Sequence, residues 1–275
     1  ASNNTAVGAN ALLQNTTGTR NTAVGSLALD ANTTADYNTA VGYSSLGANT
    51  TATHNAAFGY YTLPLNTTGV QNTAIGSQAL AANTTANNNT AVGMNAMVAN
   101  TTGAENVAIG ANALDANTTG ASNVAVGQGS LDANTTANNN TAVGHDSMKS
   151  NTTGAENTAV GKGALNANTT ASYNTAVGRS ALVLNTTGQR NVAVGYQAMD
   201  EATTGSDSVS VGYRAGHSVT TGIENTFVGY FAGGETTDVN YNNAFGSSAL
   251  GSNTTGTQNV AMGRAALYAN TTANN

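Results

Sequence analysis

The sequence predicts an all-β protein: a parallel β-solenoid (β-roll) of sixteen 17-residue coils. Three observations support this fold class: a repeat without insertions or deletions, a glycine at one position of every unit, and apolar residues confined to a few positions. We number each unit from the asparagine of its NTAVG motif, so that the glycine takes position five. This glycine occurs sixteen times, always 17 residues apart, from Gly8 to Gly263. A fixed unit length is typical of an array in which each unit stacks on the last.

The unit is too short for two helices, and it is rich in Asn, Thr and Gly, which are poor helix formers. We expect one strand on NTAV, a second around the AL motif at positions eight and nine, and turns or a short third strand at NTT. Strand side chains alternate between two faces, so with an odd number of residues per coil equivalent side chains would face opposite sides in successive coils. The alternation must therefore be interrupted once in every coil. The invariant glycine is the expected corner, because glycine accepts positive φ values.

Comparing the units position by position predicts which side chains are buried. Position four is apolar in all sixteen units, and position nine is Leu or Met in fourteen, with Gly216 and Gly233 as the exceptions. Nineteen of the twenty charged residues lie at positions six, seven, ten, eleven, sixteen or seventeen, and Asp238 is the exception. We therefore expect positions four and nine to form the core. Asparagines at positions one and twelve are expected to form amide ladders between coils.

The whole chain, residues 1–275, is predicted to be a single repeat array with irregular coils at about 200–240. It begins and ends inside a repeat, so we expect it to be a fragment of a longer fibre protein. The formal net charge is −6 and the seven basic residues are scattered, so no nucleic-acid partner is expected. No apolar run reaches the roughly 20 residues of a membrane helix, and we expect no membrane insertion in this segment.

No catalytic, cofactor or metal site is predicted, and we expect the protein not to be an enzyme. Cysteine is absent, no position is regularly acidic, and His54, His145 and His217 occupy different repeat positions. The NTT triplet in thirteen units is also a glycosylation sequon. Glycans on successive coils would stand only about 4.8 Å apart, which is too crowded, so ladders are the preferred interpretation.

Aromatic residues form the main candidate contact surface. Tyr196, Tyr213 and Tyr230 occupy position six in three successive units, and a smaller group lies at 43–61. Exposed aromatic rings suit stacking on the sugar rings of a cell-surface glycan or receptor, or contact with another fibre. The alternative is that adjacent tyrosines simply stack on one another. The candidate contact residues are Tyr196, Tyr213, Tyr230, Phe231, Tyr43, Tyr60 and Tyr61.

The unit NTAVGxxALxxNTTG resembles the repeats of trimeric fibres. It is similar to the NTAxGYxAL…NTTG arrays of phage tail-fibre-like and bacterial surface-fibre proteins, and NVAVGYQAM at 191–199 is a near match. It also resembles the shorter repeats of trimeric autotransporter adhesin (YadA-like) heads, which carry an AIG core. The resemblance spans the whole chain and implies a side-by-side homotrimer. Small residues at positions three, five and eight are compatible with close approach to a shared axis, although a single-chain solenoid would also use small residues at its corners.

These observations together predict a structural fibre shaft or head for adhesion or host-surface recognition. Its expected place is extracellular, on a cell surface or attached to a virion, and its expected partner is itself. A rigid multivalent spacer gains avidity from repeated weak contacts. Two alternatives remain open. One is a monomeric ice- or surface-binding solenoid, suggested by threonine columns at positions thirteen and fourteen, and the other is a self-assembling extracellular filament.

Overall fold

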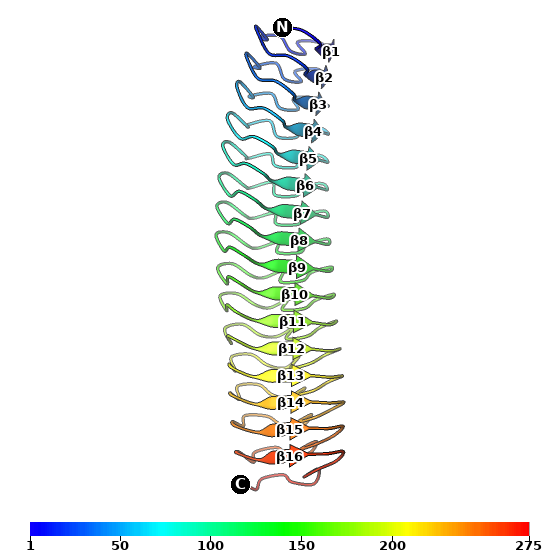
Figure 1. Ribbon diagram of the computed structural model, residues 1–275, viewed down its shortest axis with the longest axis vertical. Coiled ribbons are helices and arrows are strands. Elements are labelled where there is room, and N and C mark those ends of the chain that lie inside the picture. The colour runs from blue at the N-terminus through cyan, green and yellow to red at the C-terminus, as the bar shows by residue number, and fades with distance from the viewer. Residues whose placement is uncertain (275) are drawn as a thin grey trace. The chain divides into compact units, whose positions relative to one another are not determined.

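A computed structural model describes residues 1–274 and confirms the parallel β-solenoid. The chain divides into two compact units, Ala1–Asn138 with strands β1–β8 and Asn139–Asn275 with strands β9–β16 (Figure 1). Each coil contributes one strand, at positions two to four. The strands are β1 (Thr5–Val7), β2 (Thr22–Val24), β3 (Thr39–Val41), β4 (Ala56–Phe58), β5 (Thr73–Ile75), β6 (Thr90–Val92), β7 (Val107–Ile109), β8 (Val124–Val126), β9 (Thr141–Val143), β10 (Thr158–Val160), β11 (Thr175–Val177), β12 (Val192–Val194), β13 (Val209–Val211), β14 (Thr226–Val228), β15 (Asn243–Phe245) and β16 (Val260–Met262).

Within each unit, consecutive strands pair in parallel and with the same repeat positions opposite one another. In the first unit Ala6 pairs with Ala23, and in the second Ala159 pairs with Ala176. The register does not slip, because every coil has the same length. Each repeat position therefore forms a column of side chains that runs from coil to coil, and the sequence can be interpreted column by column.

The glycine at position five forms the predicted corner. Its φ angle lies between +117° and +143° in every coil, a region that residues with a side chain rarely adopt. The corner is also crowded, since a Cβ atom on Gly42 would lie 2.1 Å from the carbonyl oxygen of Gly59 in the next coil. Both the conformation and the close approach of successive backbones require glycine here.

The expected second strand around the AL motif is not formed, because the chain turns there. At NTT the chain bends, which agrees with the turn alternative, and no third strand is present among residues 1–274. Positions seven, nine and seventeen adopt left-handed φ values in every described coil, for example 52° at Tyr61, 54° at Leu63 and 62° at His54. Isolated left-handed residues turn the chain and cannot continue a strand. The leucine at position nine adopts this unfavourable conformation while fully buried, so its burial in the core offsets the backbone cost.

The core differs from the prediction at position four. Ala57 at position three and Leu63 at position nine are fully buried, whereas Phe58 at position four is exposed. Because strand side chains alternate, an inward residue at position three places positions two and four on the outer face. The small residues at positions three and eight therefore face the inside of their own coil. Their small size suits the interior of a single coil, which is the single-chain explanation that the sequence left open for these positions.

Asparagines form two buried columns inside each coil. In one coil, Asn72 Nδ2 and Asn83 Nδ2 both donate to the carbonyl oxygen of Ala86, at 2.8 and 3.2 Å. At position twelve the amides bond directly between coils, as Asn83 Nδ2 donates to Asn66 Oδ1 at 2.9 Å. At position one the bond uses the main chain, as Asn89 N donates to Asn72 Oδ1 at 3.0 Å. The predicted ladders are confirmed, and they satisfy polar groups at the coil centre.

Coils 13 and 14, at 208–224 and 225–241, have small residues at position nine of the core, and coil 14 has a large residue at position three instead. Gly216 and Gly233 remove the large side chain at position nine, and Phe227 stands at position three, where most coils have Ala. Phe227 is fully buried, and a Cβ atom on Gly233 would lie 2.6 Å from its ring. One phenylalanine thus fills the space that two leucines leave.

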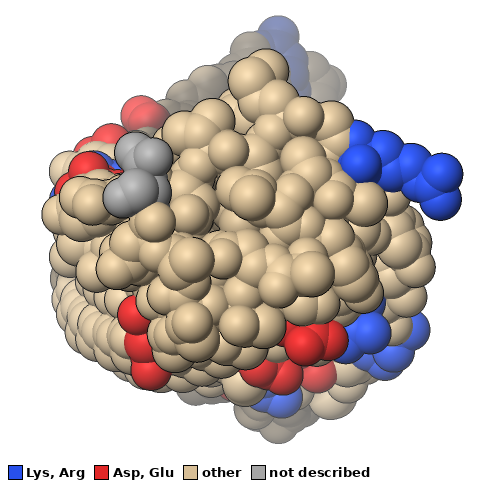
Figure 2. Space-filling model, turned by 90° about the horizontal axis from the view of Figure 1, so that it is seen from below, with Lys and Arg blue, Asp and Glu red and all other residues tan. Residues whose placement is uncertain are grey.

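Charged side chains lie at the periphery of the coil, as predicted. In the view from below, the Lys, Arg, Asp and Glu side chains in sight surround an uncharged centre (Figure 2). Among residues 1–274 the structure contains no helix of the length and apolarity that a membrane span requires.

Candidate functional site

The position-six tyrosines of the second unit form a continuous ring stack. The ring centroids of Tyr196 and Tyr213 are 5.3 Å apart with planes at 10°, and those of Tyr213 and Tyr230 are 5.3 Å apart at 6°. The stack follows from the register, because the residue at position six always comes directly after the glycine corner. The rings therefore stack on one another, and each keeps an exposed edge.

A guanidinium group covers one end of this stack. Arg179 occupies position six in the preceding coil, and its Cζ lies 5.7 Å from the ring centroid of Tyr196. The negative ring face attracts a cation in this geometry. Phe231, which the sequence grouped with the tyrosines, is half-buried and lies outside the stack, under the guanidinium of Arg214 at 5.9 Å. Phe231 occupies position seven, in a left-handed turn, and its neighbour in that column of the preceding coil is Arg214.

The first unit carries a shorter stack at the same position. Tyr43 and Tyr60 have ring centroids 5.7 Å apart with planes at 13°. Tyr61 at position seven contacts Tyr60 in a tilted arrangement, at 6.1 Å and 34°. Position six holds Ser26 before this pair and Ser77 after it, so neither neighbouring coil places a cation in this column. The structure thus brings together the three residues of the predicted smaller group.

A second aromatic column at position seventeen was missed from the sequence. Tyr37 stacks on His54 with centroids 4.9 Å apart and planes at 18°. Arg20 Cζ lies 5.2 Å from the Tyr37 ring centroid on the side of the preceding coil. The signal was available, because Arg20, Tyr37 and His54 share position seventeen in consecutive units.

A histidine cluster lies at the irregular coils of the second unit. His217 Nδ1 contacts Asp200 Oδ1, and His217 Nε2 contacts Arg214 Nη2. Glu201 Oε1 lies 3.7 Å from His217 Nε2. An Asp–His pair can orient a general base, but here the second ring nitrogen faces a guanidinium in place of a hydroxyl or thiol. His54 and His145 belong to the first and second units respectively and lie in other columns.

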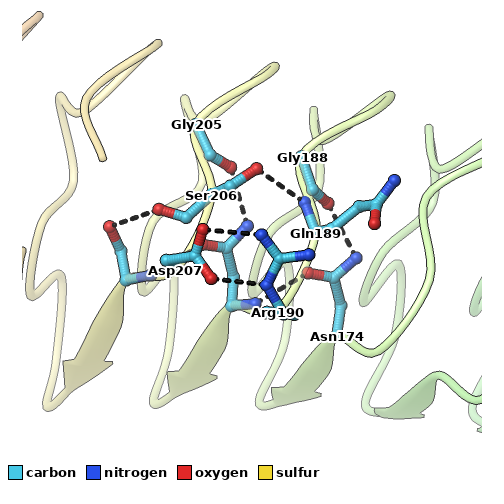
Figure 3. A network of polar contacts seen from close by, with 9 residues as sticks. Asn174, Gly188, Gln189, Arg190, Gly205, Ser206 and Asp207 are labelled. Atoms are coloured by element: carbon cyan, nitrogen blue, oxygen red, sulfur yellow. Dashed lines mark hydrogen bonds and ion pairs between the residues drawn. The ribbon is translucent and has the colours of Figure 1, made fainter. Parts of the chain in front are cut away.

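Ion pairs also follow the columns. Arg190 and Asp207 at position seventeen form a bidentate pair, with Nε–Oδ1 at 2.5 Å and Nη2–Oδ2 at 2.8 Å (Figure 3). The hydrogen bond from Arg190 lowers the pKa of Asp207, and the carboxylate in turn raises the pKa of Arg190. Beside this pair, Gln189 N donates to Ser206 Oγ at 3.0 Å. Neighbouring coils are thus joined by side chains as well as by the backbone.

The two threonine columns face different surroundings. At position thirteen the hydroxyl donates to the same position of the next coil, as Thr101 Oγ1 does to Thr118 O at 3.0 Å. At position fourteen the threonines are exposed. The exception is Asp238, whose pKa is lowered by hydrogen bonds from Thr220 and Thr221. Every coil except coil 14 therefore presents one exposed threonine at position fourteen on the outer surface.

Among the described residues, no group of three or more His, Cys, Asp or Glu side chains could hold a metal ion, and no pocket opens at the surface formed by residues 1–274. No protein-family model matches the chain, and no curated protein matches its sequence. The tyrosine, threonine and charged columns on the outside of the coils are the candidate contact surfaces.

Proposed function

We propose that this chain is a non-enzymatic structural segment of an extracellular, cell-surface or virion-attached fibre. It serves as a shaft or head for adhesion or host-surface recognition, and three copies pack side by side. The observation that carries the proposal is the strand face, defined here as the outward side chains at positions two and four of every coil, of which position four is apolar in all sixteen coils and position two is mainly Thr or Val.

The strand face is uncharged throughout, since positions two and four hold no Asp, Glu, Lys or Arg in any of the sixteen coils. At position four Ile75 and Ile109 are each 41% exposed, although isoleucine is among the residues most often buried. Contiguous exposed apolar patches mark interaction surfaces. The exposed large side chains at position four include Val7, Phe58, Ile75, Ile109, Val160, Phe245 and Met262.

Further copies of the same chain are the partners that suit this face. Each coil presents the same kind of residue at the same height, so equivalent coils in symmetric copies meet like with like. Closed rotational symmetry would cover the strand face of every copy at once. The tyrosine stacks and threonine columns then supply repeated weak contacts to a target surface, and multivalency converts them into stable attachment.

The test is the mass in solution, measured by light scattering on the whole chain. We expect about three times the chain mass of 27.2 kDa. The variant Ile75→Asp/Ile109→Asp places two charges on the strand face and is expected to yield single chains, because buried unpaired charges are costly. The matched control is Thr85→Asp/Thr119→Asp, which changes exposed position-fourteen residues in the same two coils and is expected to leave the mass unchanged.

A single-chain mass for the unmodified protein would contradict the trimer. So would equal effects of the two double variants, because the strand face would then have no special role. A mass well above three chains would favour the filament alternative.

The exposed threonine column supports a second candidate, a monomeric ice- or surface-binding solenoid. Position fourteen offers one exposed hydroxyl and methyl group in every coil except coil 14, at a spacing of about 4.8 Å. Inhibition of ice recrystallisation by the protein, lost in Thr85→Asp/Thr119→Asp and retained in Ile75→Asp/Ile109→Asp, would support this candidate over the fibre.

A further inference from the structure

The tyrosine stack of the second unit ends two coils before an arginine in the same column. Position six holds Tyr230 in coil 14, Ser247 in coil 15 and Arg264 in coil 16. The strands of these coils are paired in register, with Val228 opposite Phe245 and Phe245 opposite Met262. Ser247 thus stands where the three preceding coils place a ring, and we call this place the vacant rung.

The ring face of Tyr230 toward the vacant rung is accessible. Tyr213 has a ring on each side and is 45% exposed, and Tyr196, between a ring and a guanidinium, is 37% exposed. Tyr230 has a ring on one side and is 59% exposed. The difference is the expected result of uncovering one face. No cation or second ring occupies that face among the described residues.

The spacing of the coils suits the insertion of one ring. Successive strands lie about 4.8 Å apart, so Tyr230 and Arg264 belong to levels about 10 Å apart. A ring at the level of Ser247 would therefore lie about 5 Å from each, close to the 5.3 Å between Tyr213 and Tyr230. Guanidinium groups already lie over rings one coil away at Tyr37 and Tyr196.

The residues around the vacant rung favour an anion. Positions six and seven of coils 14 to 16 hold Tyr, Phe, Ser, Ser, Arg and Ala, with no carboxylate. Arg264 can pair with a carboxylate through two parallel hydrogen bonds. The hydroxyl of Ser247 can donate or accept a hydrogen bond. The negative ring face of Tyr230 suits the weakly positive C–H groups of a sugar ring.

We propose that the vacant rung binds one acidic pyranose, a hexuronic acid unit of a surface polysaccharide. The sugar ring stacks on Tyr230, its carboxylate pairs with Arg264, and Ser247 bonds a ring substituent. This inference rests on the proposed recognition function, for which it names the ligand class. The stack in the first unit lacks a cation at the equivalent place, because position six beyond Ser77 is Met94.

The experiment titrates the whole chain with trigalacturonate and with its methyl ester, by isothermal calorimetry. The variant Ser247→Tyr continues the stack and fills the rung, so we expect at least about tenfold weaker binding of trigalacturonate. The matched control Ser77→Tyr extends the stack of the first unit and is expected to bind like the unmodified protein. Arg264→Gln is expected to weaken binding of the acid and leave the binding of the ester unchanged.

The inference is overturned if the unmodified protein does not bind trigalacturonate, if Ser247→Tyr binds as well as the unmodified protein, or if Ser77→Tyr weakens binding equally. Equal affinity for acid and ester would overturn the role of Arg264. Light scattering separates this result from the fibre proposal. A trimer without saccharide binding overturns only the vacant rung, whereas a single chain whose binding is lost in Ser247→Tyr overturns only the trimer.

Discussion

The asparagine column at position twelve is unbroken in the first unit and interrupted in the second. From Asn15 to Asn134 every coil of the first unit supplies this amide, whereas coils 12 to 14 carry Ala202, Val219 and Thr236. Asn185 Oδ1, which precedes the gap, has no hydrogen-bond partner among residues 1–274. The fold persists through the gap, so the polar ladder stabilises the coils but does not define them.

The same two regions also fill the core with different pairs of side chains. A regular coil joins Ala57 with Leu63, and the irregular coil joins Phe227 with Gly233, in both cases at positions three and nine. The constant length of 17 residues and the glycine corner are common to both. Backbone geometry is therefore the strict requirement, and core volume can be redistributed within it.

The largest expected effect on stability comes from removing Phe227, which packs against Gly233 in the irregular coil. Phe227→Ala should lower the free energy of unfolding by about 3–5 kcal/mol, because coils 13 and 14 then have no large core side chain. Gly233→Leu alone should also destabilise, since its Cβ would meet the Phe227 ring at 2.6 Å. The double variant recreates the regular pair and should recover part of the loss, with a coupling of about 1–3 kcal/mol. Thermal unfolding by circular dichroism measures all three.

Strictly additive losses in that cycle would show that the two positions do not exchange volume. Ala57→Phe is the matched control in the regular region. It should destabilise by overpacking, because Leu63 already fills that core.

An intermediate effect on stability is expected from interrupting the asparagine column in the first unit and extending it in the second. Asn83→Ala removes bonds to Asn66 Oδ1 and Ala86 O and should cost about 1–3 kcal/mol through unsatisfied buried groups. Ala202→Asn should instead stabilise the second unit by less than about 1 kcal/mol, because its amide can donate to Asn185 Oδ1 while its own Oδ1 then faces Val219, which has no side-chain amide to donate. Chemical denaturation midpoints of the two variants should move in opposite directions. Movement in the same direction would contradict the role assigned to the ladder.

The smallest expected effect on stability comes from removing the charges of single aspartates on the outer surface. Burial and the neighbouring Asp132 raise the pKa of Asp115 in the first unit, whereas Arg190 lowers the pKa of Asp207 in the second. A raised folded pKa means that ionisation of Asp115 destabilises the fold, so acidification through that pKa should add stability. A lowered pKa has the opposite sign, and the contribution of Asp207 is lost as pH falls through its folded pKa.

Asp115→Asn should therefore raise stability at neutral pH by about 0.5 kcal/mol or less. Asp207→Asn should lower it slightly. Melting curves between about pH 2 and pH 7 should show each variant converging with the unmodified protein at acid pH, Asp207→Asn at a lower pH than Asp115→Asn because the pKa of Asp207 is lowered and that of Asp115 is raised. Persistence of either difference at low pH would mean that the charge is not its cause.

Much of the architecture was predictable because the period is constant. The solenoid, the glycine corner, the asparagine ladders and the outer charges all follow from comparing columns. The outward orientation of position four was not predictable, because an apolar residue in every coil marks a buried core or an apolar outer face equally well. The left-handed leucine at position nine was also hidden, since local propensity disfavours that conformation and only burial of the side chain supports it.

For the candidate site too, the sequence predicted which residues share a column but not how their side chains are arranged. The stacks of Tyr196, Tyr213 and Tyr230 and of Tyr43 and Tyr60 were implied by shared positions in consecutive units. Whether the rings would stack or splay depended on coil spacing, and the spacing favours stacking. Phe231 lies outside the stack because it belongs to the position-seven column, where its neighbour in the preceding coil is Arg214.

The in-register columns also bear on how such a chain changes during evolution. Gain or loss of seventeen codons, by unequal recombination between near-identical stretches of the gene, adds or removes one whole coil and leaves every column aligned. Any other change in length would shift each later glycine away from the carbonyl that it approaches. The length of the array can therefore change only by whole coils. After such a change, the remaining coils still pair with the same repeat positions opposite one another.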